Sequence, residues 1–150
     1  MKIRTRRIDK SLPLPTYEKG GACFDFVCRE GAVLRPREVK LVPSNAVIQV
    51  PEGYSVLIFA RSSTPIRKGL TLANGVGVLD SFFSGHDDEI MIEFLNISDR
   101  DVEIKKGEIL AQGMLVKHES VEWEEAEKFE EKGRGGYHGV LHRPDKKIKA

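Results

Sequence analysis

One acidic residue stands out because of the residues around it. Asp80 lies in the run GVGVLDSFF, behind aliphatic residues and just before two phenylalanines. An ionised carboxylate loses hydration in apolar surroundings, so it needs either hydrogen-bonding partners or a chemical role. A carboxylate held in a partly dry pocket can act as a general base toward water. The alternative is structural, an aspartate at a strand end that caps backbone amides.

A second group of candidate residues lies near the C-terminus. The segment KGRGGYHG carries Lys132, Arg134 and Tyr137 among glycines and cannot supply a core. It is either a disordered tail or a segment that orders over a ligand, with Tyr137 offering its ring face and the cations meeting an anion. We therefore expect a folded domain over residues 1–131 and a flexible glycine-rich arm over residues 132–150.

Other residues that could bind a metal or react have simpler structural interpretations. The run HDDE, His86 to Glu89, suggests metal ligands but is expected to be a solvated turn. Cys23 and Cys28 make neither a disulfide framework nor a zinc quartet, so both are expected to be small hydrophobic residues of a reduced, cytoplasmic protein. The basic N-terminal stretch MKIRTRRIDK has no apolar region after it, and we do not expect a signal peptide.

Short strands rather than helices must position these residues. Runs such as ACFDFVC, YSVLIFA and EIMIEFLNI are separated by Gly, Pro, Asn or Ser, which is typical of a sandwich or barrel. The net charge of +1 favours neither nucleic acid nor membrane as a partner. RSSTPIRKG predicts one helical turn capped by Ser62 or Ser63, and EEAEKFEE a short helix with Phe129 packed inward. LTLANGVGVL predicts a hairpin with Asn-Gly at its turn, and Phe82 is assigned to packing.

Five segments resemble, in order, the five motifs of the trimeric dUTPase family (deoxyuridine triphosphate pyrophosphatases). They are GGACFDF, ARSSTPIRKG, NGVGVLDSFFSG, KGEILAQ and KGRGGYHG, and the similarity covers nearly the whole chain. The resemblance implies an all-β fold, a distorted jelly roll or β-clip barrel, with one short helix and a flexible C-terminal arm. It also implies a homotrimer whose active sites are shared between subunits.

The activity implied by the resemblance is that of a dUTP diphosphatase. It would hydrolyse dUTP to dUMP and pyrophosphate, with Asp80 activating the water that attacks the α-phosphorus. Such an enzyme supplies dUMP for dTTP synthesis and keeps uracil out of DNA. By the same resemblance, Asn74 and Gly77 read uracil through a pattern of donors and acceptors that leaves other bases unpaired. Phe83 stands where the family typically has tyrosine, so the ring face against the deoxyribose is kept and the hydroxyl is lost.

Contacts to the triphosphate are also implied by the resemblance. Mg²⁺ would be carried on the phosphates and water, with Asp25 joined to the arginine network and to metal-bound water. In the arm, Tyr137 would stack on uracil. Lys132 stands at the place of the family's arginine, or Arg134 does if the register shifts, and a lysine lacks the bidentate fork of arginine. The remaining phosphate contacts are assigned to Arg61, Ser62, Ser63 and Gln112.

Two other functions stay open at this point. The first is dCTP deamination, alone or beside dUTP hydrolysis, because Glu93 in IMIEFLN falls where the related deaminases place their catalytic glutamate. Against it, RSSTPIRKG has the longer dUTPase spacing, and Glu93 could simply face solvent on an alternating strand. The second is a β-sandwich binding module that keeps the fold without the chemistry.

Overall fold

The computed structural model describes residues 1–131 and 133. The chain divides into two units, residues 1–120 and 121–150. Regular secondary structure within the described residues lies in the first unit. Its elements are β1 (Thr5–Arg7), β2 (Thr16–Tyr17), β3 (Phe24–Val27), β4 (Ala32–Leu34), β5 (Val39–Pro43), β6 (Ala46–Ile48), β7 (Tyr54–Ala60), α1 (Thr64–Lys68), β8 (Leu70–Leu72), β9 (Gly77–Leu79), β10 (Met91–Asn96), β11 (Val102–Ile104) and β12 (Ile109–Lys117).

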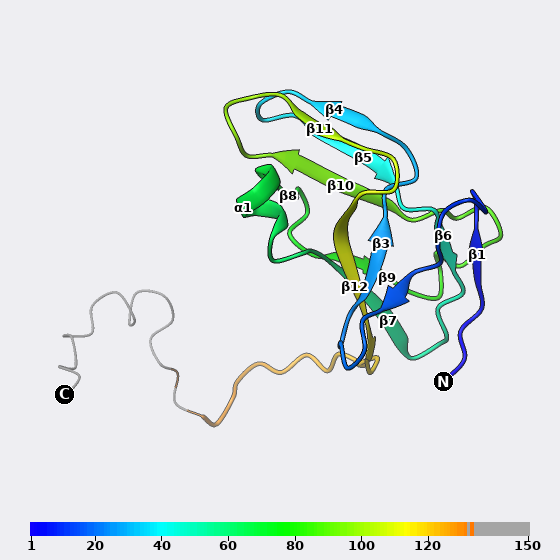
Figure 1. Cartoon of the computed structure of the whole chain (residues 1–150). Coiled ribbons are helices and arrows are strands. Elements are labelled where there is room, and N and C mark those ends of the chain that lie inside the picture. The colour runs from blue at the N-terminus through cyan, green and yellow to red at the C-terminus, as the bar shows by residue number, and fades with distance from the viewer. Residues whose placement is uncertain (132, 134–150) are drawn as a thin grey trace. The chain divides into compact units, whose positions relative to one another are not determined.

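The strands form four antiparallel sheets (Figure 1). The largest has the order β2-β3-β12-β7-β9, and a three-stranded sheet has the order β5-β10-β8. β1 pairs with β6, and β11 pairs with β4. In this part of the chain each sheet is open, and none closes on itself as a barrel. The architecture agrees with the predicted all-β fold with one short helix.

One apolar cluster joins side chains from all four sheets. Alternation along the strands decides which side chains enter it, because successive residues point to opposite faces. On β10, for example, Ile92 and Phe94 are buried while Met91 is exposed. The same alternation on β3 buries Phe24 and Phe26 and turns Asp25 to the other face. Polar residues at alternating strand positions are therefore presented away from the core.

Two local predictions at helices have opposite outcomes. The predicted helical turn in RSSTPIRKG is confirmed as α1, with Ser63 at the N-cap and Gly69 in a left-handed conformation at the C-terminal end. The Ser63 side chain makes no capping hydrogen bond. The helix predicted over EEAEKFEE is wrong, since residues 124–131 have no helical turn and Phe129 is 76% exposed. Isolated helices of this length are marginal in water, and one aromatic residue among glutamates gives no apolar face to stabilise it.

The predicted hairpin over LTLANGVGVL is also wrong in its pairing. A turn does occur at Asn74 and Gly75, where Gly75 has φ +72°. However, β8 pairs with β10 whereas β9 pairs with β7, so the strands on the two sides of the turn belong to different sheets. The turn therefore connects two sheets, and the strands on its two sides do not pair with each other.

Candidate functional site

A first pocket, here called the Arg61 pocket, gathers polar residues from three distant segments. It has a volume of about 220 Å³ and is lined by Glu18, Gly21, Ala22, Cys23, Asp25, Arg61 and Gln112. Its residues come from the stretch before β3, from β3 itself, from the end of β7 and from β12. The predicted residues Asp25, Arg61 and Gln112 are thus brought together.

The central strand β12 explains this convergence. Gln112 lies directly opposite Asp25 of β3 in the sheet register, and such cross-strand neighbours on one face are in side-chain contact range. On the other side of β12, the amide of Arg61 donates to the Leu110 carbonyl at 3.0 Å. The buried hydroxyl of Thr64 donates to the same carbonyl at 2.8 Å. Both edges of β12 therefore fix the backbone of the segments that carry the polar side chains.

Ion pairs orient the Arg61 guanidinium within this pocket. Its Nε lies 3.3 Å from Asp25 Oδ1, and its Nη2 lies 3.8 Å from Glu18 Oε1. The Asp25 side chain is only 15% exposed, so its pairing with Arg61 offsets part of the cost of burying a charge. Ser62 is exposed and Ser63 half-buried, both just beyond the pocket at the start of α1. A fixed guanidinium with hydroxyls close in sequence is suited to binding phosphate oxygens.

A second pocket, here called the Asn74 pocket, lies beside the turn between β8 and β9. Its volume is about 420 Å³, and its lining residues are Leu41, Ile58, Asn74, Gly77, Val78, Leu79, Phe83, Ile90, Met91 and Glu93. The predicted base-reading residues Asn74, Gly77 and Phe83 therefore share one cavity. Most of the remaining lining is apolar, as in pockets that accept a flat ring with a few polar edges.

Gly77 lets the backbone approach the neighbouring strand closely. A Cβ atom at this position would lie 3.2 Å from Ile58 Cβ and 3.6 Å from Asn74 Nδ2. The absence of a side chain therefore leaves the Asn74 amide and the Gly77 backbone accessible from the pocket. Such backbone groups can supply the fixed donors and acceptors that recognise the edge of a base.

Asp80 is placed differently from the sequence-based expectation of burial. It follows the last residue of β9, is exposed, and accepts a hydrogen bond from the Phe82 amide through Oδ1 at 2.9 Å. Within one chain it thus has the capping role considered as the alternative. The assignment of Phe82 to packing is wrong within this chain, since the ring is 96% exposed. The reason is that β9 ends at Leu79 and the chain turns outward, which apolar composition alone does not reveal.

The two pockets lie in different parts of the molecule, and no residue lines both. In the large sheet, Gly77 pairs with Ile58, one of the core residues. Gln112 pairs with Phe59, the next residue along β7, and so belongs to the opposite face. One chain therefore presents the Arg61 pocket on the face of Gln112, whereas the Asn74 pocket lies around the edge strand β9 and shares none of its lining residues.

The HDDE run is only partly the solvated turn that was predicted. His86 and Asp87 are exposed, and Asp88 Oδ2 accepts the Gly85 amide at 2.7 Å. Glu89 differs because its side chain is 13% exposed and both oxygens accept from Arg29, at 2.8 Å each. This hydrogen-bonded pair raises the pKa of Arg29. Glu89 therefore anchors the end of the loop that follows Asp80.

The two cysteines have different surroundings, and both are free thiols. Cys28 is a small core residue, as predicted, and is 1% exposed. Burial, with a smaller contribution from Glu108, raises the pKa of Cys28 to about 12. Cys23 instead lines the Arg61 pocket. Sequence reasoning missed this position, although Cys23 lies inside the segment that resembles the first motif.

Several further residues bear on the site prediction. Glu18, missed from sequence, lines the Arg61 pocket, and Leu41 and Met91, also missed, line the Asn74 pocket. The only signal for Glu18 was its place just before GGACFDF. The predicted arm residues Lys132, Arg134 and Tyr137 lie outside the described residues.

Comparisons with known proteins identify the family. The family model for dUTPase matches residues 10–140. The deoxyuridine 5'-triphosphate nucleotidohydrolase of Hydrogenobaculum sp. is 36% identical over 141 residues, which cover 91% of this chain and 96% of that protein. The crystal structure of dUTPase from Streptococcus mutans superposes with a TM-score of 0.71 at 26% identity, covering 79% of this chain and 98% of the other. A dUTPase from phage phi11 of S. aureus, which coordinates a structural Mg(II) ion, has a TM-score of 0.77 at 22% identity, covering 87% and 100%.

An all-β fold of the jelly-roll type with one short helix is the architecture shared with these solved structures. The chain belongs to the dUTPase family. The family predicted from the five motifs is therefore confirmed, and with it, at the level of the family, the predicted enzyme class of dUTP diphosphatase.

Proposed function

We propose that this chain hydrolyses dUTP to dUMP and pyrophosphate in active sites shared between the subunits of a homotrimer. The observation that carries the proposal is the convergence of Asp25, Arg61 and Gln112 in one pocket, although they lie far apart in the sequence. Each was assigned to the same triphosphate site by a different motif.

The Arg61 pocket is proposed to bind the phosphates. Arg61 would donate to the phosphate oxygens, with Ser62, Ser63 and Gln112 completing the set of donors. The carboxylates of Asp25 and Glu18 hold Arg61 in place before the substrate arrives. Such preorganisation lowers the reorganisation that charge development would otherwise require.

The Asn74 pocket is proposed to bind the nucleoside. Asn74 and the Gly77 backbone would pair with the uracil edge, and the Phe83 ring would lie against the deoxyribose. A fixed pattern of donors and acceptors rejects cytosine because buried polar groups would be left unpaired. The apolar lining supplies the remaining contact surface.

Asp80 is proposed to be the general base. Its carboxylate would accept a proton from water as the water oxygen bonds to the α-phosphorus and the bond to pyrophosphate breaks. Asp80 is exposed in the single chain and lies at the rim of the Asn74 pocket, between its lining residues Leu79 and Phe83. We infer that the Arg61 pocket of a neighbouring subunit covers it. The arm residues Lys132 and Tyr137 would then close over the nucleotide.

The residues of the Arg61 pocket fit an ion that arrives with the substrate. Among residues 1–131 and 133, no three His, Cys, Asp or Glu side chains gather as a metal site. The pocket offers the oxygens of Glu18, Asp25 and Gln112. Mg²⁺ commonly binds through substrate phosphates and water with one or two carboxylates, so Asp25 would hold metal-bound water. The ion would supply charge neutralisation on the triphosphate.

The cellular setting stays a prediction. We propose a role in dUMP supply for dTTP synthesis and in keeping uracil out of DNA, in the cytoplasm and without a nucleic-acid or membrane partner. No helix in the described part of the chain is long and apolar enough to cross a membrane.

The proposed reaction is tested by pyrophosphate release from dUTP, dCTP, dTTP and UTP at one fixed Mg²⁺ concentration. We expect release from dUTP alone to be fast. Comparable rates with UTP or dTTP would show that the Asn74 pocket does not select base and sugar. No release from dUTP would leave the binding-module hypothesis.

One observation favours a second candidate, dCTP deamination. Glu93 is half-buried in the Asn74 pocket, close in the fold to the base-reading residues. Within the described residues its carboxylate has neither a hydrogen bond nor an ion pair. A glutamate there could transfer protons while water replaces a 4-amino group. Ammonia released from dCTP, lost in Glu93→Gln while dUTP hydrolysis persists, would establish this activity.

A further inference from the structure

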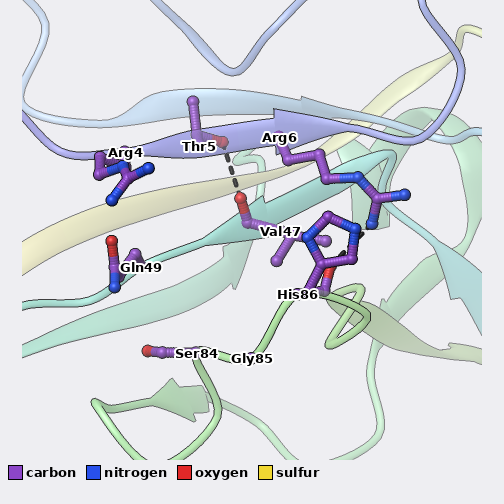
Figure 2. A pocket seen from close by; sticks show the side chains of 8 residues that line it. All are labelled: Arg4, Thr5, Arg6, Val47, Gln49, Ser84, Gly85 and His86. Carbon is purple, nitrogen blue, oxygen red and sulfur yellow. Dashed lines mark hydrogen bonds between the residues drawn. The ribbon is translucent and has the colours of Figure 1, made fainter.

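A third cavity has no role in the proposed hydrolysis. It lies between the β1–β6 ribbon and the loop that follows Phe83, and its volume is about 410 Å³ (Figure 2). It shares no lining residue with the Arg61 pocket or the Asn74 pocket. The residues that line it, here called the Arg4 pocket, are Arg4, Thr5, Arg6, Val47, Gln49, Ser84, Gly85 and His86.

The strand register places two arginines on one wall of this cavity. Arg6 is opposite Val47 in the β1–β6 pairing, and the Gln49 amide donates to the Arg4 carbonyl at 2.9 Å. Arg4 and Arg6 are two residues apart on an extended chain, so their side chains share a face and begin about 6.8 Å apart. Figure 2 shows the Arg4 and Gln49 side chains directed toward each other and the His86 ring beside the Arg6 guanidinium.

The charge of the lining is positive. It contains two guanidiniums and a histidine, and none of the eight residues is acidic. Arg6 donates to the His86 carbonyl at 2.7 Å and lies 3.4 Å from the exposed Asp87 carboxylate at the edge. Arg4 makes neither a side-chain hydrogen bond nor an ion pair within the described residues. Arg4 is therefore the cation of this pocket that is most available to a ligand.

We propose that the Arg4 pocket binds an oligophosphate anion, with one phosphoryl group on each guanidinium. Two planar forks on one strand face match two linked tetrahedral groups, because each fork can donate two parallel hydrogen bonds to phosphate oxygens. The amide of Gln49 and the ring of His86 add donors at the two ends. The simplest such ligand is pyrophosphate, and this site is independent of the proposed hydrolysis.

The test is calorimetric titration of pyrophosphate into the full-length protein carrying Arg61→Gln, which weakens the Arg61 pocket and leaves the Arg4 pocket intact. In this background we expect one anion site per chain to bind pyrophosphate, and the added Arg4→Gln substitution to weaken that binding at least about tenfold, through the loss of one charge-assisted contact. Arg100→Gln, at an exposed arginine elsewhere, is the matched control and should leave the affinity unchanged. Arg4 is the chosen position because its side chain supports no other residue of the described structure.

Three results would overturn the site. One is the absence of pyrophosphate binding in the Arg61→Gln protein, and another is equal affinity in this protein with and without Arg4→Gln. The third is an Arg4→Gln protein with altered molar mass by light scattering and unaltered anion binding, which would make this face an interface between copies. If Arg61→Gln fails to fold, pyrophosphate is titrated into wild type and Arg4→Gln instead, and an equal number and affinity of anion sites in the two proteins would overturn the proposal.

Discussion

The strongest prediction concerns the division of the site between chains. Asp80→Asn and Arg61→Gln each remove one half-site function, and each variant alone should lose activity by on the order of 100-fold or more. Because the Arg61 pocket and the Asn74 pocket share no lining residue, we propose that the functional halves come from different subunits. Mixing the two inactive variants should then restore activity.

The size of the recovery follows from random assembly. After equimolar refolding, a site is intact when its Asp80 comes from an Arg61→Gln chain and its Arg61 from an Asp80→Asn chain. Each choice has even odds, so about one quarter of the sites should be intact. A site built within one chain would give no recovery at all. Wild type mixed with the double variant is the control, with about one quarter expected for shared sites and about one half for sites within one chain.

The assay is pyrophosphate release at saturating dUTP, together with co-purification through a tag on one variant to prove that mixed assemblies form. Arg61→Gln leaves the Asp25 carboxylate unpaired, which could destabilise the fold. Thermal melting should therefore be used to show that both variants are folded. Proven mixed assemblies with activity no higher than that of the separate variants would refute the shared site. The divided pockets would then need another explanation.

Three further predictions concern individual residues. Alkylation of the native protein should modify Cys23 and spare Cys28, because the thiol of Cys28 is buried and its pKa is raised to about 12. Pyrophosphate or a dUTP analogue should slow the reaction of Cys23, which lines the Arg61 pocket. Equal labelling of both cysteines would contradict the described burial. The hydrogen bond from Lys106 at 2.6 Å lowers the pKa of Asp9, so its stabilisation is fully present at neutral pH and decreases progressively as the pH falls below about 4. Urea unfolding should show Asp9→Asn to be less stable than wild type at pH 7, with a smaller difference at pH 3. An unchanged difference at pH 3 would exclude the ionised pair as its cause. Gly77→Ala should lower the free energy of unfolding by about 1–3 kcal/mol because its Cβ would be crowded, and a wild-type value in urea would mean that the strands separate freely.

Motif order allowed the family, and the grouping of three residues in each of the two pockets, to be predicted from sequence. Asn74, Gly77 and Phe83 do share one cavity, as do Asp25, Arg61 and Gln112. These groupings were accessible because each motif carries a fixed spacing of residue types. The turn at Asn74 was accessible as well, since Asn-Gly is a local signal.

Non-local features were not accessible in the same way. The Asn-Gly turn bridges two sheets rather than closing a hairpin, because pairing with β7 and β10 involves distant residues. Glu89 was assigned to a solvated turn, since its partner Arg29 lies 60 residues away. Asp80 and Phe82 are exposed because β9 ends at Leu79, and the apolar residues around them do not allow that strand end to be predicted. The alternation of apolar and polar residues predicts which face of a strand is buried, whereas the strand or side chain that packs against this face depends on the whole fold.

The separation of the Arg61 pocket from the Asn74 pocket has a consequence for how such a protein would behave on dilution. If sites are shared as proposed, a lone chain would carry all the chemical groups and still be inert, because each pocket would need its counterpart from another subunit. Turnover per chain would then fall with concentration once subunits begin to separate, and it would return on reconcentration. Turnover per chain would then report the fraction of associated subunits, without any dedicated regulatory element in the fold.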